Sequence, residues 1–372
     1  MVVGEHRTTK LVIDRDALRQ NIKNEKSLLA SDTNLFAVVK ANAYGHGLVQ
    51  IAQEAIAAGA DGLCVAILDE ALELRNAAID VPILVLGITE VDNAAIAQQY
   101  NISLTVGSVE WLQDFQRMAF KHASSNKLNV HLAVDTGMGR IGFREIGEFK
   151  QALQLVNQAP FNFEGLFTHF ATADETNQDY FNHQMTIWHQ LTDDMDTMPP
   201  IVHVANSATS LWHLPVTGNM IRFGMAMYGL NPSGYEIETP FKLKPVLSLV
   251  TKIDFVKQIK QGEFVSYGAT YQAKADEWIG TIPLGYADGY PRRMQGFHVL
   301  VAEQFCEIVG RVCMDQIMIR LPSKLPVGTD VTLIGRQHGK QISSEDVAEY
   351  AHTINYEIMT SMAPRLKRVY IN

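Results

Sequence analysis

Apolar and polar positions follow two different periods along the first 230 residues. Short apolar, β-branched runs predict eight strands, at residues 35–40, 62–66, 83–87, 103–106, 129–135, 163–169, 201–206 and 220–229. Most of the gaps place apolar residues three or four positions apart and predict helices, at residues 48–58, 68–77, 90–99, 109–123, 143–158 and 180–195. Strands that alternate with helices indicate parallel βα units, and eight units favour a closed (β/α)8 TIM barrel. An open, doubly wound α/β sheet is the alternative.

Beyond residue 240 the pattern changes to that of a second domain. Alternating runs predict strands at residues 247–255, 278–284, 298–301, 307–309, 316–321 and 330–334, with Gly and Pro between them. One helix is expected at residues 343–352, where Ser343 opens a capping pattern. We therefore expect an α/β barrel over residues 1–240 and a mostly-β C-terminal domain over residues 241–372. The first strand of the chain is a candidate partner for the sheet of that second domain.

Composition narrows the classes of partner. The 372-residue chain is 47% apolar and has a formal net charge of −9, which argues against nucleic acid or an anionic membrane as a partner. No apolar run reaches the length of a membrane span, and the first ten residues lack the apolar stretch of a signal peptide. Cys64, Cys306 and Cys313 lack metal-ligand spacing and fit a reducing compartment. We expect a cytoplasmic protein without a structural metal.

Several polar residues are predicted to meet at one end of the barrel. Enzymes of this architecture carry their catalytic residues at the C-terminal ends of the strands. The residues expected there are Lys40, Arg140, His169, Asn206, Ser207 and Arg222. Each alone has an ordinary explanation, because strand ends are polar. Their joint placement favours one site that combines a lysine, two arginines and a histidine.

Lys40 ends an apolar run and allows two interpretations. It either extends into water where the strand stops, or stays partly desolvated as a nucleophile. In such barrels the loops after the seventh and eighth strands often bind phosphate, and here these loops hold Ser207 and Gly224. A lysine beside a phosphate site points to pyridoxal phosphate held as a Schiff base. The alternative is an ordinary barrel end without a cofactor.

Residues 137–142 match GxGxxG, a fingerprint of dinucleotide-binding loops. Glu164 follows about 20 residues later, where that fingerprint has an acidic residue. Two features oppose a dinucleotide site. Asp135 would repel a pyrophosphate, and the motif lies in the fifth βα unit instead of the first. We favour a tight turn in which the glycines present Arg140 to the barrel end.

Longer motifs resemble those of alanine racemases, which are fold-type III enzymes that use pyridoxal phosphate. The segment that resembles the cofactor-lysine signature is Ala37-Val-Val-Lys-Ala-Asn-Ala-Tyr-Gly-His-Gly47. The resemblance extends nearly end to end, through His203-Val-Ala-Asn-Ser207, Arg222-Phe-Gly, Val265-Ser-Tyr-Gly-Ala-Thr-Tyr271, Gly285-Tyr-Ala-Asp-Gly-Tyr290, Gly310-Arg-Val-Cys-Met-Asp315 and Pro364-Arg-Leu. It implies an enzyme that interconverts L-alanine and D-alanine and supplies D-alanine for peptidoglycan.

The resemblance also implies two bases on opposite faces of the substrate. Lys40 resembles the Schiff-base lysine, which becomes a free base once the substrate amine displaces it. Tyr267 resembles the second base, with His169 and Arg222 beside it in a shared hydrogen-bond chain. Arg222 resembles the residue that faces the pyridine nitrogen; because arginine holds its proton, we expect racemisation to be favoured over transamination. In this family the β domain reaches the other subunit's site, so a homodimer with composite active sites is implied.

The other implied roles concern binding. The residues that resemble phosphate contacts are Tyr44, Ser207, Gly224 and Tyr356, and Asn206 is a further candidate for cofactor binding. Arg140 and the backbone N–H of Met314 resemble the grip on the substrate carboxylate. The residues that resemble an entry corridor are Tyr286, Tyr356, Asp174, Arg292, Arg311 and Ile354. A narrow corridor would favour a small amino acid.

One position departs from the family pattern. Many members carry a carbamylated lysine seven residues before the arginine that corresponds to Arg140, and this chain has Ala133 there. The carbamate would orient the arginine with a negative charge, which alanine cannot supply. We expect a chloride ion, or a carboxylate from elsewhere, in its place.

Two alternatives stay open. A racemase of broader specificity, for serine or lysine, needs a wider corridor, and Tyr286 and Tyr356 argue against that. A pyridoxal-phosphate carrier protein with a related barrel is the alternative from another class. Such carriers generally consist of the barrel alone, so the second domain with Tyr267 argues against it.

Overall fold

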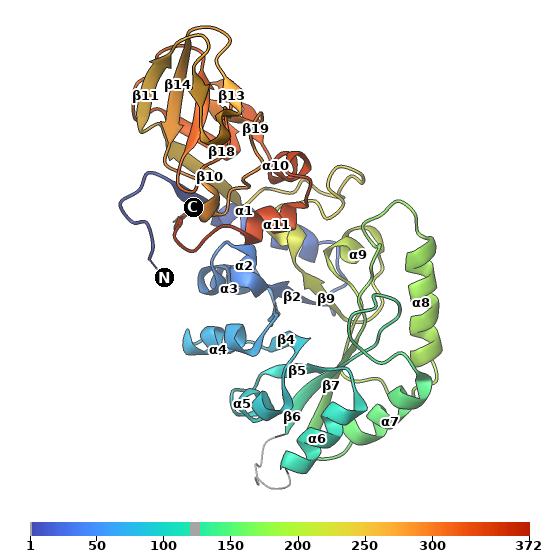
Figure 1. The fold of residues 1–372 in the computed structure, drawn as a ribbon. Helices are drawn as coiled ribbons and strands as arrows, with labels where there is room; N and C mark the ends of the chain where they lie inside the picture. The colour runs from blue at the N-terminus through green and yellow to red at the C-terminus, as the bar shows by residue number, and fades with distance from the viewer. Residues whose placement is uncertain (1, 120–126) are drawn as a thin grey trace. The chain divides into compact units, whose positions relative to one another are not determined.

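The structure is a computed structural model, and it describes residues 2–119 and 127–372 (Figure 1). The chain divides into two compact units. The barrel unit consists of Leu18–Ala43 and Leu48–Lys244. The β unit consists of the N-terminal segment up to Ala17, the short insertion Tyr44–Gly47, and Pro245–Asn372. No helix within the described ranges is long and apolar enough to cross a membrane.

The barrel unit is built on eight parallel strands. In spatial order they run β8-β7-β6-β5-β4-β3-β2-β9. Their bounds are β2 Asn34–Val38, β3 Gly62–Val65, β4 Ile83–Ile88, β5 Ser103–Val106, β6 Leu128–Ala133, β7 Phe161–Phe167, β8 Ile201–His203 and β9 Met220–Phe223. The sheet closes because β9 pairs with β2 and, on its other side, Ala205 forms a parallel bridge with Ile221. The expected TIM barrel is therefore confirmed, and the open-sheet alternative is wrong.

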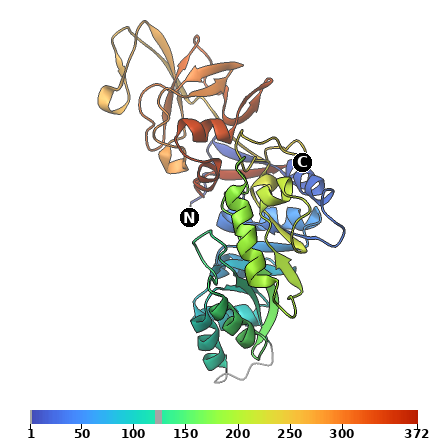
Figure 2. The same cartoon turned by 90° about the vertical axis from the view of Figure 1, so that its right-hand side faces the viewer.

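Helices cover the outside of these strands (Figures 1 and 2). Their bounds are α3 Leu48–Ala57, α4 Leu68–Asn76, η1 Val91–Asn93, α5 Ala94–Gln99, α6 Val109–Ala119, α7 Ile146–Val156, α8 Asp179–Thr192 and α9 Ser207–Trp212. The expected continuation of α6 to residue 123 lies outside the described residues. Two further helices were not expected, α1 Arg15–Lys26 and the short α2 Lys40–Tyr44. The run at residues 220–229 was expected as one strand, but β9 ends at Phe223 and a buried 3₁₀ turn, η2 Met225–Tyr228, follows.

A barrel strand is buried along its whole length where helices cover its outer face and the packed barrel interior covers its inner face. Every residue of β3, β5 and β9 is buried. Burying one Val, Leu or Ile side chain stabilises a fold by about 1.5–3 kcal/mol. A few polar side chains interrupt this interior, among them His131, His203 and Arg222. Because buried polar groups need partners, these three residues mark the part of the barrel that is built for something besides packing.

The β unit contains three sheets. The largest has the order β16-β15-β18-β10-β1-β20, with β19 paired to β18; β11-β14-β17 and β12-β13 form the others. The bounds are β1 Lys10–Asp14, β10 Leu247–Lys252, β11 Phe255–Ile259, β12 Phe264–Val265, β13 Tyr271–Gln272, β14 Glu277–Ile282, β15 His298–Val301, β16 Gln304–Glu307, β17 Ile317–Leu321, β18 Asp330–Gln337, β19 Lys340–Ile342 and β20 Lys367–Ile371. The N-terminal strand β1 lies between β10, antiparallel, and β20, parallel. Strand pairing thus ties the two ends of the chain into one sheet.

Short helices and turns complete the β unit. They are η3 Tyr267–Ala269, η4 Tyr286–Asp288, α10 Ser344–Tyr350 and α11 Asn355–Thr360. Ser343 caps α10, because its hydroxyl accepts from Asp346 N (2.9 Å) while the Asp346 carboxylate accepts from Ser343 N (2.7 Å). Asp288 is fully buried and binds both Arg7 (2.7 Å) and Arg365 (2.6 Å). Burial alone would raise the pKa of Asp288, but these arginines hold it below its usual value.

Candidate active site

Four of the expected residues meet at the C-terminal ends of the barrel strands. Lys40 follows β2, His169 follows β7, and Arg222 lies on β9. Arg222 Nη2 lies 3.2 Å from His169 Nδ1. Arg140, in the loop after β6, is close enough for its charge to lower the pKa of both Lys40 and His169. The barrel therefore collects three cations and one imidazole at a single end.

Arg222 is buried and uses both terminal nitrogens for internal bonds. Nη1 donates to His203 Nδ1 (2.6 Å) and to the His203 carbonyl (2.7 Å). Nη2 donates to the carbonyl of Thr168 (2.9 Å), with His169 Nδ1 and the Val204 carbonyl also in reach. No described residue accepts from Nε. The Nε–H group is therefore the donor that Arg222 has left for a ligand.

Burial gives His169 and Arg222 different charge states. The pKa of His169 lies well below its usual value because of burial, and then because of the positive charges of Arg222, Arg140 and Lys40. His169 is therefore neutral, and since its Nδ1 accepts from Arg222, its own proton sits on Nε2 as a free donor. Burial lowers the pKa of Arg222 to about 10, which still leaves this group charged at neutral pH.

Lys40 lies where a partly desolvated amine can form. Burial lowers its pKa first, and the charges of Arg140 and Arg222 lower it further. A lowered pKa increases the fraction of neutral amine, which is the form that attacks a carbonyl or accepts a proton. Of the two interpretations drawn from the sequence, this environment favours the nucleophile.

The backbone after Lys40 is strained. Ala41, Asn42, Ala43 and Tyr44 all have φ between 51° and 54°, so four successive residues take the left-handed helical conformation. Each such residue costs roughly 1–2 kcal/mol. The Asn42 carboxamide holds the turn by accepting from Leu48 N (2.9 Å). Strained backbone of this kind clusters at functional sites, which agrees with a special role for the segment that follows Lys40.

The GxGxxG loop does not form a phosphate cradle. Gly137 N (3.0 Å) and Gly139 N (2.9 Å) both donate to the carboxylate of Asp135, so these donors are already used. Gly137, Gly139 and Gly142 have positive φ values, as a tight turn requires. The turn leaves Arg140 exposed, and within the described ranges its guanidinium has neither an ion pair nor a hydrogen bond.

The loops after β8 and β9 are joined by side chains. Asn206 caps α9 by accepting from Thr209 N (2.9 Å). Gly224 N donates to the buried hydroxyl of Ser207 (2.9 Å), which links the two loops. The structure therefore brings together Asn206, Ser207 and Gly224, three barrel residues that were predicted to bind the cofactor.

In the β unit, two loops bring a second set of expected residues together. Tyr267 and Met314 line one pocket with Ser266 and Cys313. Ser266 Oγ donates to the Arg311 carbonyl (2.6 Å), so the two loops are tied side by side. The Tyr267 ring is exposed, and so is the Met314 side chain. Tyr286 belongs to the same surface, because its backbone N–H donates to the Cys313 carbonyl (3.0 Å).

The short insertion in the β unit carries Tyr44. Its ring lies 6.2 Å from that of Tyr356 on α11. Arg368 Nε donates to the Gly45 carbonyl (2.7 Å) and the Tyr370 hydroxyl to the His46 carbonyl (2.9 Å), which fix the insertion on the β unit. The structure therefore brings Tyr44 and Tyr356 together.

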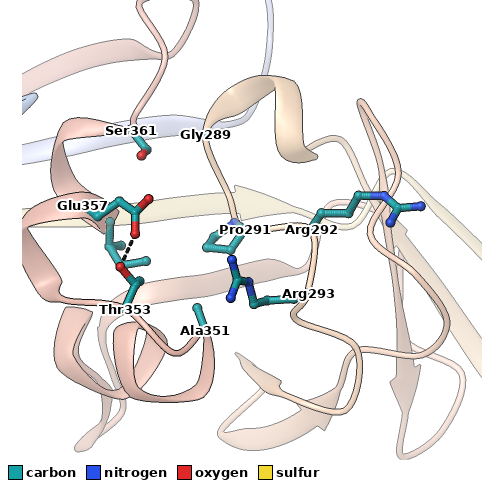
Figure 3. Close-up of a pocket in the computed structure, with 9 residues that line it drawn as sticks. Gly289, Pro291, Arg292, Arg293, Ala351, Thr353, Glu357 and Ser361 are labelled. Carbon is teal, nitrogen blue, oxygen red and sulfur yellow. Dashed lines mark hydrogen bonds between the residues drawn. The ribbon is translucent and has the colours of Figure 1, made fainter.

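The remaining corridor residues are spread. Figure 3 shows a pocket of the β unit in which Arg293 points toward the cavity while Arg292 points away from it. Glu357, on the opposite wall, accepts a hydrogen bond from Thr353. Ile354 is exposed at the N-terminus of α11. Asp174 belongs to the barrel unit, between β7 and α8, so one chain does not gather the corridor residues on one unit.

Two family models match almost the whole chain. The model described as alanine racemase, N-terminal domain, covers residues 13–232, and that of the C-terminal domain covers residues 246–370. The chain belongs to the alanine racemase family. An alanine racemase of Limosilactobacillus reuteri (strain DSM 20016) is 55% identical over 371 residues, which are 100% of this chain and 99% of that protein.

Solved structures of alanine racemases agree with this membership. That of alanine racemase from E. faecalis is 49% identical, covers 100% of both chains and has a TM-score of 0.98. A histidine racemase from Leuconostoc mesenteroides subsp. sake NBRC 102480 is 37% identical with a TM-score of 0.94, and again covers 100% of both chains. The resemblance inferred from the motifs is confirmed, and matches over both domains argue against a barrel-only carrier.

His203, His131 and Glu164 were not expected near the site. Each histidine lies in an otherwise apolar strand, in the runs Val130-His-Leu and Val202-His-Val. A polar residue inside an apolar strand was the available signal. Its meaning depends on which strands are neighbours across the barrel, which one sequence does not provide.

Proposed function

We propose that this protein interconverts L-alanine and D-alanine with pyridoxal 5′-phosphate as cofactor, and so supplies D-alanine for peptidoglycan as a cytoplasmic homodimer. The observation that carries this proposal is the cluster at the barrel end. A lysine with a lowered pKa lies in the field of a buried arginine that keeps one free N–H. Membership of the alanine racemase family supports the choice of reaction.

The residues present fit the cofactor. Lys40 would hold its carbonyl carbon, and Arg222 Nε–H would face its ring nitrogen. The residues that would hold the rest of the cofactor, including its phosphate, are Asn206, Ser207, Gly224, Tyr44 and Tyr356. When bound, the cofactor supplies an electron sink for the charge that remains on the substrate Cα after deprotonation.

Racemisation requires that a proton leave one face of Cα and that another arrive on the opposite face. Lys40 serves one face, because burial and the nearby cations lower its pKa and so increase the fraction of its amine that is neutral. Tyr267 serves the other face. An ordinary phenol titrates near pH ~10, so Tyr267 needs stabilisation of its charged form. The free Nε2–H donor of His169, backed by the Arg222 charge, is suited to supply it.

Arg222 limits side reactions by keeping its proton. A pKa of about 10 leaves the guanidinium charged at neutral pH, so it donates a hydrogen bond without protonating its acceptor. Arg222 would thereby leave the ring nitrogen of the bound cofactor unprotonated and make the cofactor a weaker electron sink. Prompt return of the proton to Cα would then be favoured, and with it racemisation over transamination.

Recognition of the substrate falls to groups on both units. Arg140 has a guanidinium free to bind the substrate carboxylate, and Met314 offers its backbone N–H. The residues that would narrow the substrate's entry corridor to the active site are Tyr286, Tyr356, Asp174, Arg292, Arg311 and Ile354. The exposure of Tyr267 and Met314 fits a homodimer in which the β unit of one chain completes the barrel site of the other.

The test is incubation of the cofactor-loaded protein with L-alanine in heavy water. We expect D-alanine to appear together with solvent deuterium at Cα. Deuterium without D-alanine would mean that one base works alone and would remove Tyr267 from its role. Cofactor-loaded protein that gives neither product would contradict the proposal.

A racemase for other amino acids is the second candidate, because the histidine racemase has the same fold over its whole length. The same assay with L-serine, L-lysine and L-histidine separates the two candidates. A kcat/KM for L-alanine that exceeds the others by tenfold or more supports the alanine enzyme. Equal kcat/KM values for L-alanine and the other amino acids would favour a racemase of broader specificity.

A further inference from the structure

A line of hydrogen bonds crosses the barrel interior from Arg222 to Glu164. His203 Nδ1 lies 2.6 Å from Arg222 Nη1, and His203 Nε2 lies 2.8 Å from His131 Nδ1. His131 Nε2 lies 3.0 Å from Glu164 Oε2, and Ser103 donates to the same oxygen. Both histidines are buried. Residues from β9, β8, β6, β7 and β5 are thereby joined around the barrel.

The direction of every bond in this line follows from its two ends. Arginine has only donors, so His203 Nδ1 must present its lone pair to Arg222. The neutral His203 ring then carries its proton on Nε2 and donates to His131 Nδ1. His131 in turn carries its proton on Nε2 and donates to Glu164, and a carboxylate only accepts. Both ends therefore require the same tautomers, and no step conflicts with another.

The groups around this line keep the positive charge on Arg222 and the negative charge on Glu164. Burial puts the pKa of His203 well below its usual value, and the charge of Arg222 lowers it further. The Phe167 ring stacks on His203 at 4.7 Å and lies 5.4 Å from the Arg222 guanidinium, so an aromatic ring covers one side of this pair. Burial would raise the pKa of Glu164, but the bonds from His131 and Ser103 hold it below its usual value. The line thus has a guanidinium at one end, a carboxylate at the other and the neutral His203 ring beside the guanidinium.

We propose that His131 and Glu164 are positioning residues for Arg222 and that they act through His203. The acceptor at Glu164 keeps the His203 lone pair turned toward Arg222. With that acceptor in place, the guanidinium keeps both terminal nitrogens engaged and directs its Nε–H at the ligand. The catalytic consequence rests on the role of Arg222 in the proposed function, whereas the tautomers of the two histidines do not depend on it.

Gly165 provides the room for this line. A Cβ on Gly165 would lie 2.0 Å from His131 Nδ1, the atom that accepts from His203, and 2.4 Å from the neighbouring ring carbon. The strand register between β6 and β7 also shifts between Val130 and His131. Gly165→Ala should therefore displace the His131 ring from His203 while leaving every member of the line in place.

Two substitutions at Glu164 distinguish the effect of losing its hydrogen-bond acceptor from the effect of losing its volume. Glu164→Gln keeps an acceptor oxygen in a side chain of the same length, and Glu164→Leu removes the acceptor at similar volume. Nitrogen-15 NMR of labelled histidines, with and without cofactor, reports which ring nitrogen of His203 is protonated. Racemase kcat and KM for L-alanine report the consequence at the site.

In the unsubstituted protein and in Glu164→Gln we expect neutral His203 with its proton on Nε2. In Glu164→Leu and in Gly165→Ala we expect a mixture of tautomers and a fall in kcat of about tenfold, with KM within about twofold, as for the loss of one buried hydrogen bond. Ser103→Ala removes the other donor to Glu164 but leaves the acceptor for His131, so it should change both readouts less than Glu164→Leu does.

Three results would overturn the proposal. The first is a folded Glu164→Leu protein with an unaltered His203 signal. The second is an equal loss of kcat in Glu164→Gln and Glu164→Leu, which would make charge or packing the cause. The third is a change of tautomer without a change in kcat. If the unsubstituted protein does not racemise alanine, the proposed function fails, and the NMR comparison still decides the assignment of the line.

Discussion

The barrel end and the loops of the β unit carry different kinds of functional residue. Arg222 is 4% exposed and makes bonds with four other residues, whereas Tyr267 is 69% exposed at a loop tip. In the barrel, burial and neighbouring cations lower the pKa of Lys40 and neutralise His169. On its own unit, Tyr267 is exposed and shares a pocket with Ser266, Cys313 and Met314. The proposed barrel residues thus lie among neighbouring charges, whereas the proposed second base lies on an open surface.

The largest effect is expected from replacing Lys40, the proposed nucleophile. Lys40→Arg keeps a positive charge at the end of β2, but arginine cannot act as a neutral amine. We expect racemisation to fall by about 10³-fold or more and the cofactor's Schiff-base absorption to be lost, because a base contributes 10²–10⁴-fold. Lys26→Ala, a control without an assigned role that loses an ion pair with Asp61 and a hydrogen bond to the Gly59 carbonyl, should keep both. Retained absorption in Lys40→Arg would contradict the assignment.

The exposed base should affect turnover but not cofactor attachment. Tyr267→Phe removes the phenol and leaves Lys40 intact, so we expect the cofactor spectrum to persist while kcat falls by about 10²–10³-fold. Tyr271→Phe is the matched control, since Tyr271 bonds Glu277 on the same unit and has no assigned role. Turnover that survives in Tyr267→Phe, measured by polarimetry, would move the second base elsewhere.

A smaller effect is expected at Arg140, the exposed member of the barrel cluster. Ala133 leaves its guanidinium without the carbamate that orients it in many relatives. We propose that chloride takes that place, so replacing chloride by acetate at constant ionic strength should raise KM for alanine a few-fold, roughly one hydrogen bond to a charged group. Bicarbonate should have no effect. Equal KM values in both salts would exclude a role for chloride.

The smallest effect on activity is expected at a buried charge away from the site. Glu25 is fully buried, and burial raises its pKa to about 7, while the nearby Ser210 hydroxyl only partly opposes this. A raised pKa in the folded state means that the acid stabilises the fold when protonated. Its contribution is therefore fully present below about pH 4.5, is lost as the pH rises, and is gone above about pH 7.

Glu25→Gln removes this dependence. At pH 8 we expect urea unfolding to show a gain of up to about 3 kcal/mol, from a shift of about two and a half pH units at 1.36 kcal/mol each. At pH 5 the gain should be much smaller, and kcat should be unchanged at both. Glu110→Gln, at an exposed position, should change stability at neither pH. A gain that does not depend on pH would mean that Glu25 is not protonated in the folded state.

Much of the barrel could be predicted because parallel strands covered on both faces are short apolar runs bounded by helical periods. The prediction was wrong after β9, where a buried 3₁₀ turn continues the apolar run of the strand. It also missed α1 and α11. The left-handed turn after Lys40 could not be predicted, because its small residues carry no local preference for four successive positive φ values.

The site could be predicted in part. Strand-end logic placed Lys40, His169 and Arg222 together, because parallel strands share one end. It could not predict the line through His203, His131 and Glu164, which depends on the order of strands around the barrel. Nor could periodicity assign a role to Tyr267, which looks like an ordinary strand tyrosine until the motif around it is compared with a family.

The central claim is that each active site combines the barrel of one chain with the β unit of another. Two inactive variants, Lys40→Arg and Tyr267→Phe, can be co-expressed with different tags and purified as mixed dimers. Such a dimer would contain one site with both native bases, so we predict about half of the normal activity. Mixed dimers that stay inactive, although each variant still folds and dimerises, would show that one chain supplies both bases to its own site.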